Sequence, residues 1–340
     1  MMAFFQPQRR LLTLRRGALP SPWAWITSGA AACLFLAVAL NAAISRAVPW
    51  PLLDATILLT REPITPIPPA PTADPSKLAL GEELFRSPLL SRDQTRSCLS
   101  CHDVGSNGAD SVQHAIGADG KTLLFNTLTV FNAALSFRLN WAGDKRTLES
   151  QIVWALNSAP GLGSDMPGVL ARLNADAEMA GRFVAAYGHN PDQASLVDAL
   201  ATYERSLVTP DSRFDRWLKG DKAALSAKEL DGYALFKSFG CVSCHQGVNV
   251  GANLFQRHGI FHPLASPEPR VLRMPSLRNV ATTPPYFHDG SAPTLSEAVR
   301  RMARAQLDQS LSEQEVDAIV AFLNSLTGNY RGAPLKAASP

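Results

Sequence analysis

The chain carries two short motifs whose residue types and spacing can attach a prosthetic group. They read Cys98-Leu-Ser-Cys101-His102 and Cys241-Val-Ser-Cys244-His245. In such a motif two thiols on one turn reach the two vinyl groups of a haem, and the adjacent imidazole ligates the iron. The sequence therefore predicts two covalently bound c-type haems, with His102 and His245 as iron ligands.

The four cysteines have another common use, a structural zinc site. Zinc would use the thiols without needing a histidine directly after each pair, and the distance between the pairs far exceeds the usual spacing of zinc knuckles. A disulfide framework is also disfavoured, because only Cys33 is left outside the motifs. Haem is the better interpretation.

The chemistry of each haem depends on what fills the sixth position at its iron. A methionine there raises the redox potential and suits electron transfer, whereas an open position admits peroxide or oxygen. The C-terminal segment offers two methionines, Met274 and Met302. Their spacing alone does not choose between them, and methionine is also a common core residue.

A helix is predicted just ahead of each haem motif, over 77–85 and 225–239. The sequence ahead of the first motif reads L-A-L-G-E-E-L-F-R-S-P, and that ahead of the second reads D-G-Y-A-L-F-K-S-F-G. This weak repeat indicates two related haem domains, 77–220 and 221–333. Apolar residues at three-to-four spacing predict further helices over 196–207, 213–218 and 313–326. Signals for strands are scarce. The fold class is therefore mostly α, with two cytochrome c-like haem domains.

The N-terminal region has the pattern of a membrane anchor. Residues 1–21 contain four arginines, and the apolar run within 22–47 is just long enough to cross a bilayer as a helix. The preceding arginines put the N-terminus inside and the remainder outside. An uncleaved transmembrane helix is favoured over a signal cleaved near Ser45-Arg46-Ala47. Residues 48–76 are rich in proline and are interpreted as an extended linker.

Composition excludes one class of partner. The formal net charge is +3 over 340 residues, and the basic residues are scattered along the sequence. A nucleic-acid partner therefore has no electrostatic basis. The hydrophobic content of 46% is enough for sizeable cores.

The C-terminal half contains a specific series of segments. It reads Met274-Pro-Ser-Leu-Arg-Asn279, then Pro284-Pro-Tyr-Phe-His-Asp-Gly290, then Thr294-Leu-Ser-Glu-Ala-Val299 and Met302. From about 78 to 328 the sequence resembles the bacterial di-haem cytochrome c peroxidase family, which includes MauG, an enzyme that oxidises tryptophans in a partner protein. The resemblance implies that Met302 is the distal ligand of the second haem and that Met274 packs in the core.

The resemblance implies roles for other residues one at a time. Trp141 matches the tryptophan that lies between the haems and relays electrons, although it would also suit an ordinary core. Arg278 and His288 match residues near the haem edges, where an arginine can pair with propionates. A calcium ion between the domains is implied as well, held by side-chain and backbone oxygens of Asn126, Thr283 and Pro285.

Two departures from the family pattern fall around the first haem. The family's capping histidine after an Ile-Gly pair is replaced by Ala118, which leaves His114 as the only nearby histidine. The iron is therefore expected to be open, unless a loop brings His114 to it. The family's peroxide-cleaving glutamate is also missing from Asn157-Ser-Ala-Pro-Gly161-Leu-Gly163, so Asp165, His114 or a water molecule would have to move the proton. Asp165 would equally suit a helix cap.

The leading hypothesis is a di-haem peroxidase that faces the periplasm and is tethered to the bacterial inner membrane. Electrons enter at the His245/Met302 haem, pass Trp141, and reduce hydrogen peroxide at the His102 haem. The donor is a small electron-transfer protein or a quinol-linked donor. A second hypothesis is MauG-like oxidation of aromatic side chains in a partner protein. A third is a non-enzymatic electron carrier or redox sensor with both irons fully ligated.

Overall fold

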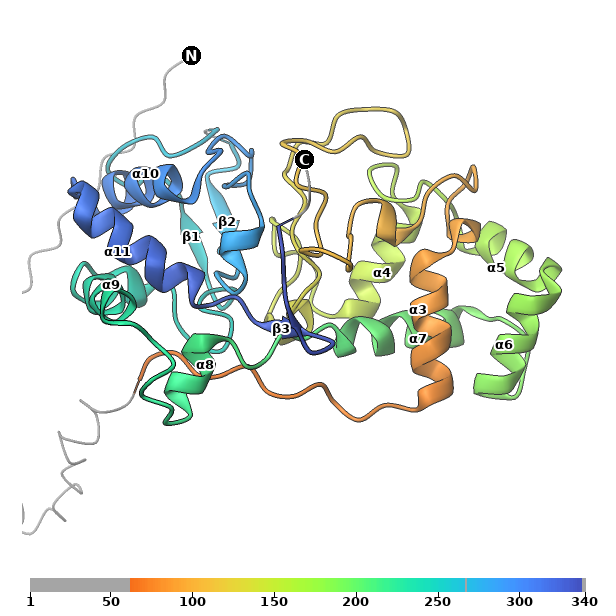
Figure 1. Cartoon of the computed structure of the whole chain (residues 1–340). Helices are drawn as coiled ribbons and strands as arrows, with labels where there is room; N and C mark the ends of the chain where they lie inside the picture. The colour runs from red at the N-terminus through yellow and green to blue at the C-terminus, as the bar shows by residue number, and fades with distance from the viewer. Residues whose placement is uncertain (1–61, 267, 338–340) are drawn as a thin grey trace, which may run out of the picture. The chain divides into compact units, whose positions relative to one another are not determined.

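A computed structural model describes residues 62–266 and 268–337 (Figure 1). The basic tail over 1–21, the transmembrane helix predicted within 22–47 and part of the linker lie outside the described residues. Over those two ranges, no helix combines the length and the apolar character needed to span a bilayer. The described part is mostly helical, which confirms the fold class predicted from the sequence.

The elements divide between the two halves of the described chain. The helices of the first half are α3 (Pro75–Arg86), α4 (Leu148–Asn157), α5 (Met166–Ala175), α6 (Ala177–Tyr187) and α7 (Gln193–Ser206). Those of the second half are α8 (Arg213–Leu218), α9 (Ala227–Ser238), α10 (Leu295–Leu307) and α11 (Glu313–Asn324). Short 3₁₀ turns cover Pro88–Leu90, Cys98–Ser100, Ala133–Leu135, Cys241–Ser243 and Val280–Thr282. Short antiparallel strands pair as β1 (Phe255–Arg257) with β2 (Val271–Arg273) and as β3 (Asn329–Tyr330) with β4 (Ala333–Pro334).

Polar caps fix where the main helices begin. Asp192, Ser226 and Ser312 form capping boxes at the starts of α7, α9 and α11. Thr147 and Thr294 cap α4 and α10, and each side-chain oxygen accepts from the amide three residues further on. These caps satisfy amides that the first turn of a helix leaves without partners.

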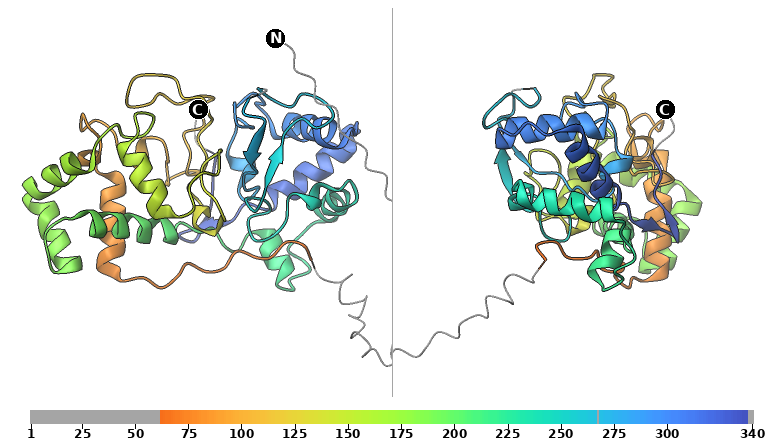
Figure 2. Two further views of the ribbon diagram at one scale, coloured as in Figure 1. Left: turned by 180° about the vertical axis from the view of Figure 1, so that it is seen from behind. Right: turned by 60° about the vertical axis from the view of Figure 1, so that its left-hand side comes forward.

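Each half is built around one close helix contact. Helix α3 packs against α7 in the first half, and α9 packs against α11 in the second (Figures 1 and 2). A glycine lies at each contact: a methyl group at Gly81 would clash with the Ala199 carbonyl group, and one at Gly232 would clash with that of Ala318. The two glycines therefore allow the paired helix backbones to approach closely.

Two buried cores surround these contacts. One includes Leu84, Phe183 and Leu200, and the other includes Phe214, Tyr233 and Phe322. Ile64, which lies in the predicted linker, is 1% exposed and belongs to the second core. Phe214 of α8 belongs to it too, although α8 precedes the domain boundary predicted at 220. The second half is therefore completed by segments that come before it in the sequence.

Candidate functional site

Both haem motifs fold into the same local structure. Each begins with a single 3₁₀ turn, over Cys98–Ser100 and Cys241–Ser243. The amide of His102 donates to the Cys98 carbonyl oxygen at 3.0 Å, and that of His245 donates to the Cys241 carbonyl oxygen at 2.9 Å. This turn brings the two thiols and the imidazole of a motif onto one short segment, as covalent haem attachment requires.

The orientation of the two imidazoles suits iron ligation. Nδ1 of His102 lies 3.2 Å from the Gly108 carbonyl oxygen, and Nδ1 of His245 lies 3.4 Å from that of Val250. A backbone acceptor for Nδ1–H fixes the ring and leaves Nε2 free as the ligand. Burial lowers the pKa of both rings, to about 4 for His245, so each is in the neutral form that binds a metal.

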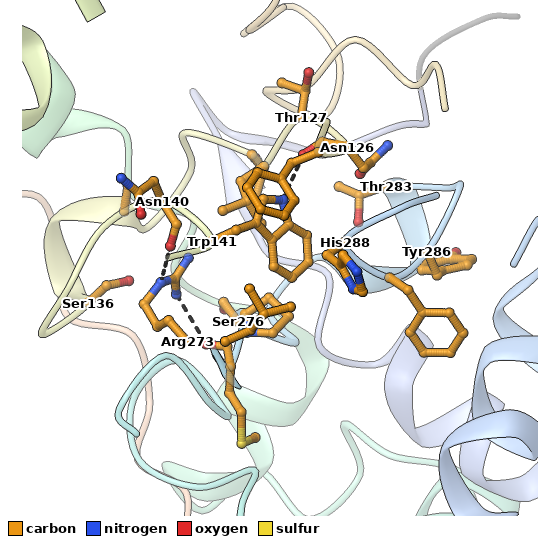
Figure 3. A pocket seen from close by; sticks show the side chains of 18 of the residues that line it. Asn126, Thr127, Ser136, Asn140, Trp141, Arg273, Ser276, Thr283, Tyr286 and His288 are labelled. Atoms are coloured by element: carbon orange, nitrogen blue, oxygen red, sulfur yellow. Dashed lines mark hydrogen bonds between the residues drawn. The ribbon is translucent and has the colours of Figure 1, made fainter. Parts of the chain in front are cut away.

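A single cavity of about 930 Å³ is lined by both motifs. Many of its other lining residues are apolar, and they include side chains of α4, α7, α9, α10 and α11. Trp141 and His288 line it as well (Figure 3). Thiols, neutral imidazoles and apolar side chains are what two c-type haems need. The residues present therefore fit the group that the motifs predict.

The two halves of the cavity are related by an internal repeat. Asn132 and Asn279 both have a φ of 61°, and each directly precedes a 3₁₀ turn. Further along the chain, isolated antiparallel bridges recur at matching positions, joining Leu139 to Lys145 and Tyr286 to Ala292. The repeat seen ahead of the haem motifs thus continues through the residues that line the cavity.

Trp141 and His288 occupy equivalent positions in this repeat, because each follows the first residue of its bridge by two places. Their rings meet edge to face, with centroids 6.2 Å apart and planes at 70°. The Trp141 side chain is buried and donates through Nε1 to the Asn126 carbonyl oxygen at 2.7 Å (Figure 3). The residue predicted to relay electrons therefore lines the cavity with its ring orientation fixed.

Helices α4 and α10 also occupy equivalent places, since each follows a capping threonine. Met302, the predicted distal ligand, is the eighth residue of α10 and lines the cavity. The eighth residue of α4 is Ala155, which lines the cavity as well. An alanine side chain has no atom that can ligate iron, so α4 supplies no counterpart of Met302.

Arg278 already has a carboxylate partner within the protein. Its Nη1 lies 2.9 Å from Oδ1 of Asp215, and both side chains are fully buried. Its Nε and Nη2 donate to the backbone carbonyl oxygens of Val248 and Thr65, each at 2.8 Å. These bonds connect Arg278 to α8 and to the segment before α3. Arg278 also lines the cavity, so its pairing with a haem propionate stays a prediction.

His288 is buried, and its Nε2 has no hydrogen-bond partner within the described part of the chain. The His258 ring lies 4.9 Å away between centroids, and His258 Nε2 lies 2.9 Å from the Pro269 carbonyl oxygen. Burial is the main cause that lowers the pKa of His288. The neutral ring can therefore bond a polar group within the cavity.

The three predicted calcium ligands, Asn126, Thr283 and Pro285, all line the cavity. The Asn126 amide nitrogen donates to the Val112 carbonyl oxygen at 2.8 Å, and Thr283 Oγ1 donates to that of Val280 at 3.3 Å. Among the described residues, no three His, Cys, Asp or Glu side chains form a group suited to a metal ion. A calcium ion here would depend on amide, hydroxyl and carbonyl oxygens, and it stays a prediction.

Neither residue predicted to move the proton lines the cavity. Asp165 is exposed and caps α5, where its Oδ1 accepts from the Gly168 amide at 2.7 Å. His114 has a buried Nδ1 without a partner in the described chain, but its side chain is not among those that line the cavity. The geometry therefore supports the helix-cap interpretation of Asp165.

The cavity lining also includes polar side chains that were not predicted from the sequence, among them Gln151 and Glu204. Gln151 projects from α4, and its buried Oε1 lacks a partner among the described residues. Glu204 of α7 lies near Cys98, and burial raises the pKa of its carboxyl to about 8. One signal could have revealed Gln151, because it interrupts the apolar face formed by Leu148, Ile152 and Leu156.

Comparison with known proteins identifies the family. Residues 75–223 match the family described as di-haem cytochrome c peroxidase, and residues 230–327 match cytochrome c. Cytochrome c551 peroxidase from Nitrosomonas europaea is 35% identical over 291 residues, which cover 81% of this chain and 87% of that protein. The chain belongs to the di-haem cytochrome c peroxidase family. This confirms the resemblance found in the sequence.

Two further relatives extend the comparison. Cytochrome c peroxidase Ccp from Escherichia coli (strain K12) is 37% identical over 287 residues, covering 79% of this chain but only 62% of the E. coli protein. Among solved structures, a MauG-like protein associated with microbial copper homeostasis matches with a TM-score of 0.68 at 26% identity, covering 83% of this chain and 96% of that one. As a member of the di-haem cytochrome c peroxidase family, the chain is an oxidoreductase with two covalently bound haem c groups.

Proposed function

We propose that this protein reduces hydrogen peroxide to water at the His102 haem, with electrons that arrive through the His245 haem. The observation that carries the proposal is that Trp141, Met302 and both haem motifs line one cavity. The reaction takes two electrons and two protons for each peroxide and releases two water molecules.

The unequal side chains of α4 and α10 support this division of roles. Met302 would ligate the His245 haem and suit it to electron transfer, whereas Ala155 would supply no ligand to the His102 haem and leave it accessible to peroxide. When bound, the haem at His102 supplies the iron chemistry that breaks the O–O bond. The chain's own residues orient the peroxide and move its protons.

We assign these tasks to Gln151 and Glu204, which both line the cavity. The Gln151 amide binds peroxide by hydrogen bonding, since no protein group of the described chain occupies its Oε1. Glu204 keeps its proton at neutral pH because burial raises its pKa to about 8. It can therefore donate that proton in a chain that lacks the family's glutamate.

Spectroscopy and turnover of the haem-loaded protein test this proposal. Electron paramagnetic resonance of the oxidised protein should show one high-spin iron, which is open, and one low-spin iron. Peroxide should be consumed while a reduced small cytochrome or a quinol-linked donor is oxidised in a ratio of two electrons per peroxide. Two low-spin irons without peroxide consumption would instead identify an electron carrier.

One observation favours a second function, the MauG-like oxidation of aromatic side chains in a partner protein. Trp154 of α4 lines the cavity and is 38% exposed, so one aromatic side chain reaches from the cavity to the surface. A protein substrate that is too large to enter the cavity would meet this side chain. Peroxide-dependent oxidation of a tryptophan or tyrosine in a co-purified protein, abolished by Trp154→Leu, would establish the second function. Turnover with a small donor should survive that substitution.

We propose a periplasmic location, with residues 22–47 anchoring the chain in the inner membrane. The arginines before this apolar segment and the attachment of c-type haem outside the cytoplasm support it. After cell fractionation the protein should sediment with membranes, and protease cleavage within 48–76 should release a haem-containing fragment. Recovery of the intact chain in the soluble periplasmic fraction would contradict the anchor.

A further inference from the structure

Arg273 is a buried cation at the haem cavity. The residue is 5% exposed and lines the cavity. Its Nε donates to the Asn140 carbonyl oxygen at 2.7 Å, and its Nη1 donates to that of Met274 at 3.1 Å (Figure 3). Burial alone shifts its pKa, downward to about 10, and no acidic side chain in the described ranges offsets that shift.

This arrangement is unfavourable for the polypeptide by itself. A guanidinium that leaves water without a counter-charge is strongly destabilised, and neutral carbonyl acceptors compensate it only in part. The neighbouring buried arginine, Arg278, differs because it is paired with Asp215. Arg273 therefore requires an anion that the described chain does not supply. Each haem c carries two propionates, and a carboxylate is the planar acceptor that an arginine binds best.

The backbone ties Arg273 to the second haem motif. It is the last residue of β2 and pairs with Phe255 of β1, the strand that follows the His245 segment. The Met274 carbonyl oxygen that accepts from its Nη1 also accepts from the amide of Ala252, at 3.1 Å. The guanidinium and the loop after His245 thus share one acceptor.

We propose that Arg273 binds a propionate of the haem attached at Cys241 and Cys244, and that its charge raises the reduction potential of that haem. A nearby positive charge favours the reduced state, because reduction removes positive charge from the iron. The Arg273 amide also donates to the Trp141 carbonyl oxygen at 2.9 Å, so one residue contacts both the second haem and the segment of the predicted relay. Arg273 is a positioning residue, and the proposal depends on bound haem alone, not on peroxidase activity.

Redox titration of the haem-loaded protein tests the proposal, with each haem followed by its own absorption signal. In Arg273→Gln the reduction equilibrium of the second haem should become about tenfold less favourable, which is 59 mV for one electron. The first haem should keep its potential. Arg273→Lys retains the charge and should restore most of the lost potential. Arg270→Gln is the matched control, because the Arg270 side chain is 72% exposed, and both potentials should equal those of the wild type.

Two results would overturn the proposal when covalent haem content is complete. One is an unchanged potential of the second haem in Arg273→Gln, and the other is a shift confined to the first haem. If Arg273→Gln does not fold, resonance Raman spectroscopy of Arg273→Lys decides. The propionate-bending band of the second haem should move relative to the wild type, and an unmoved band would refute the contact.

Discussion

The rings of Trp141 and His288, which hold equivalent positions in the two halves of the repeat, meet edge to face at 6.2 Å. Trp141 belongs to the first half of the repeat and His288 to the second, and both line the cavity. The residue predicted to relay electrons therefore lies where the two halves of the cavity meet.

Replacing Trp141 by Phe should slow electron transfer between the haems by about tenfold or more, equivalent to 1.36 kcal/mol of barrier. The substitution removes the Nε1 bond to the Asn126 carbonyl oxygen and part of the contact with His288. Rapid mixing of the half-reduced protein with peroxide measures the rate. Trp217→Phe is the control, because Trp217 packs on Phe214 and does not line the cavity. Equal rates for Trp141→Phe and the wild type would rule out the relay.

The substitution Ala155→Met should close the first haem. A methionine at the eighth position of α4 reproduces the place of Met302 on α10, so the high-spin ferric signal should disappear. If the new ligand occupies the iron 99% of the time, peroxide turnover falls about 100-fold. Ala155→Leu adds similar volume without a sulfur atom and should keep the high-spin signal. Persistence of that signal in Ala155→Met would show that the two helices are not equivalent at the iron.

The buried pair of Arg278 and Asp215 should dominate the stability of the second half. Arg278→Met leaves a fully buried carboxylate without its partner, which costs about 3–5 kcal/mol and lowers the Tm by roughly 10 °C. Lys228→Met is the control, because the Lys228–Asp317 pair is exposed and contributes at most about 1 kcal/mol. Calorimetry of the three proteins makes the comparison. A small effect of Arg278→Met would mean that the pair is hydrated.

Glu204 should make stability depend on pH. Burial raises the pKa of its carboxyl from 4.5 to about 8, so the folded state holds the proton more tightly than the unfolded state. The stabilisation is fully present below about pH 4.5 and is lost as the pH rises through about 8, at up to about 1.36 kcal/mol per pH unit. Urea unfolding between pH 5 and 8 should show this slope in the wild type and in Glu178→Gln, an exposed control. Glu204→Gln should flatten it, and an unchanged slope would place the titration elsewhere.

Local signals made half of the site predictable. Haem attachment depends on five consecutive residues, so both motifs could be identified from their spacing alone. Helices α7, α9 and α11 were predictable because their apolar positions recur at helical spacing after capping residues. Helix α4 gave a weaker signal, since Ile152, Val153 and Trp154 are β-branched or aromatic residues that lower helix propensity.

The charged groups of the cavity were less predictable because their partners come from tertiary structure. Arg278 pairs with Asp215 of α8, and the spacing of these two residues in the sequence does not predict the contact. Arg273 lies five residues earlier and keeps its guanidinium free of any acidic partner in the described chain. The different partners of these two nearby arginines are thus set by packing, which their spacing in the sequence does not reveal.

The equivalence of α4 and α10 also has an evolutionary consequence. Under the proposed roles, the electron-transfer haem has Met302 where the reactive haem has Ala155, on equivalent helices. Loss of that one methionine after duplication of an electron carrier would open one iron to substrate without rebuilding the backbone. The reverse change would give a protein in which both haems only transfer electrons.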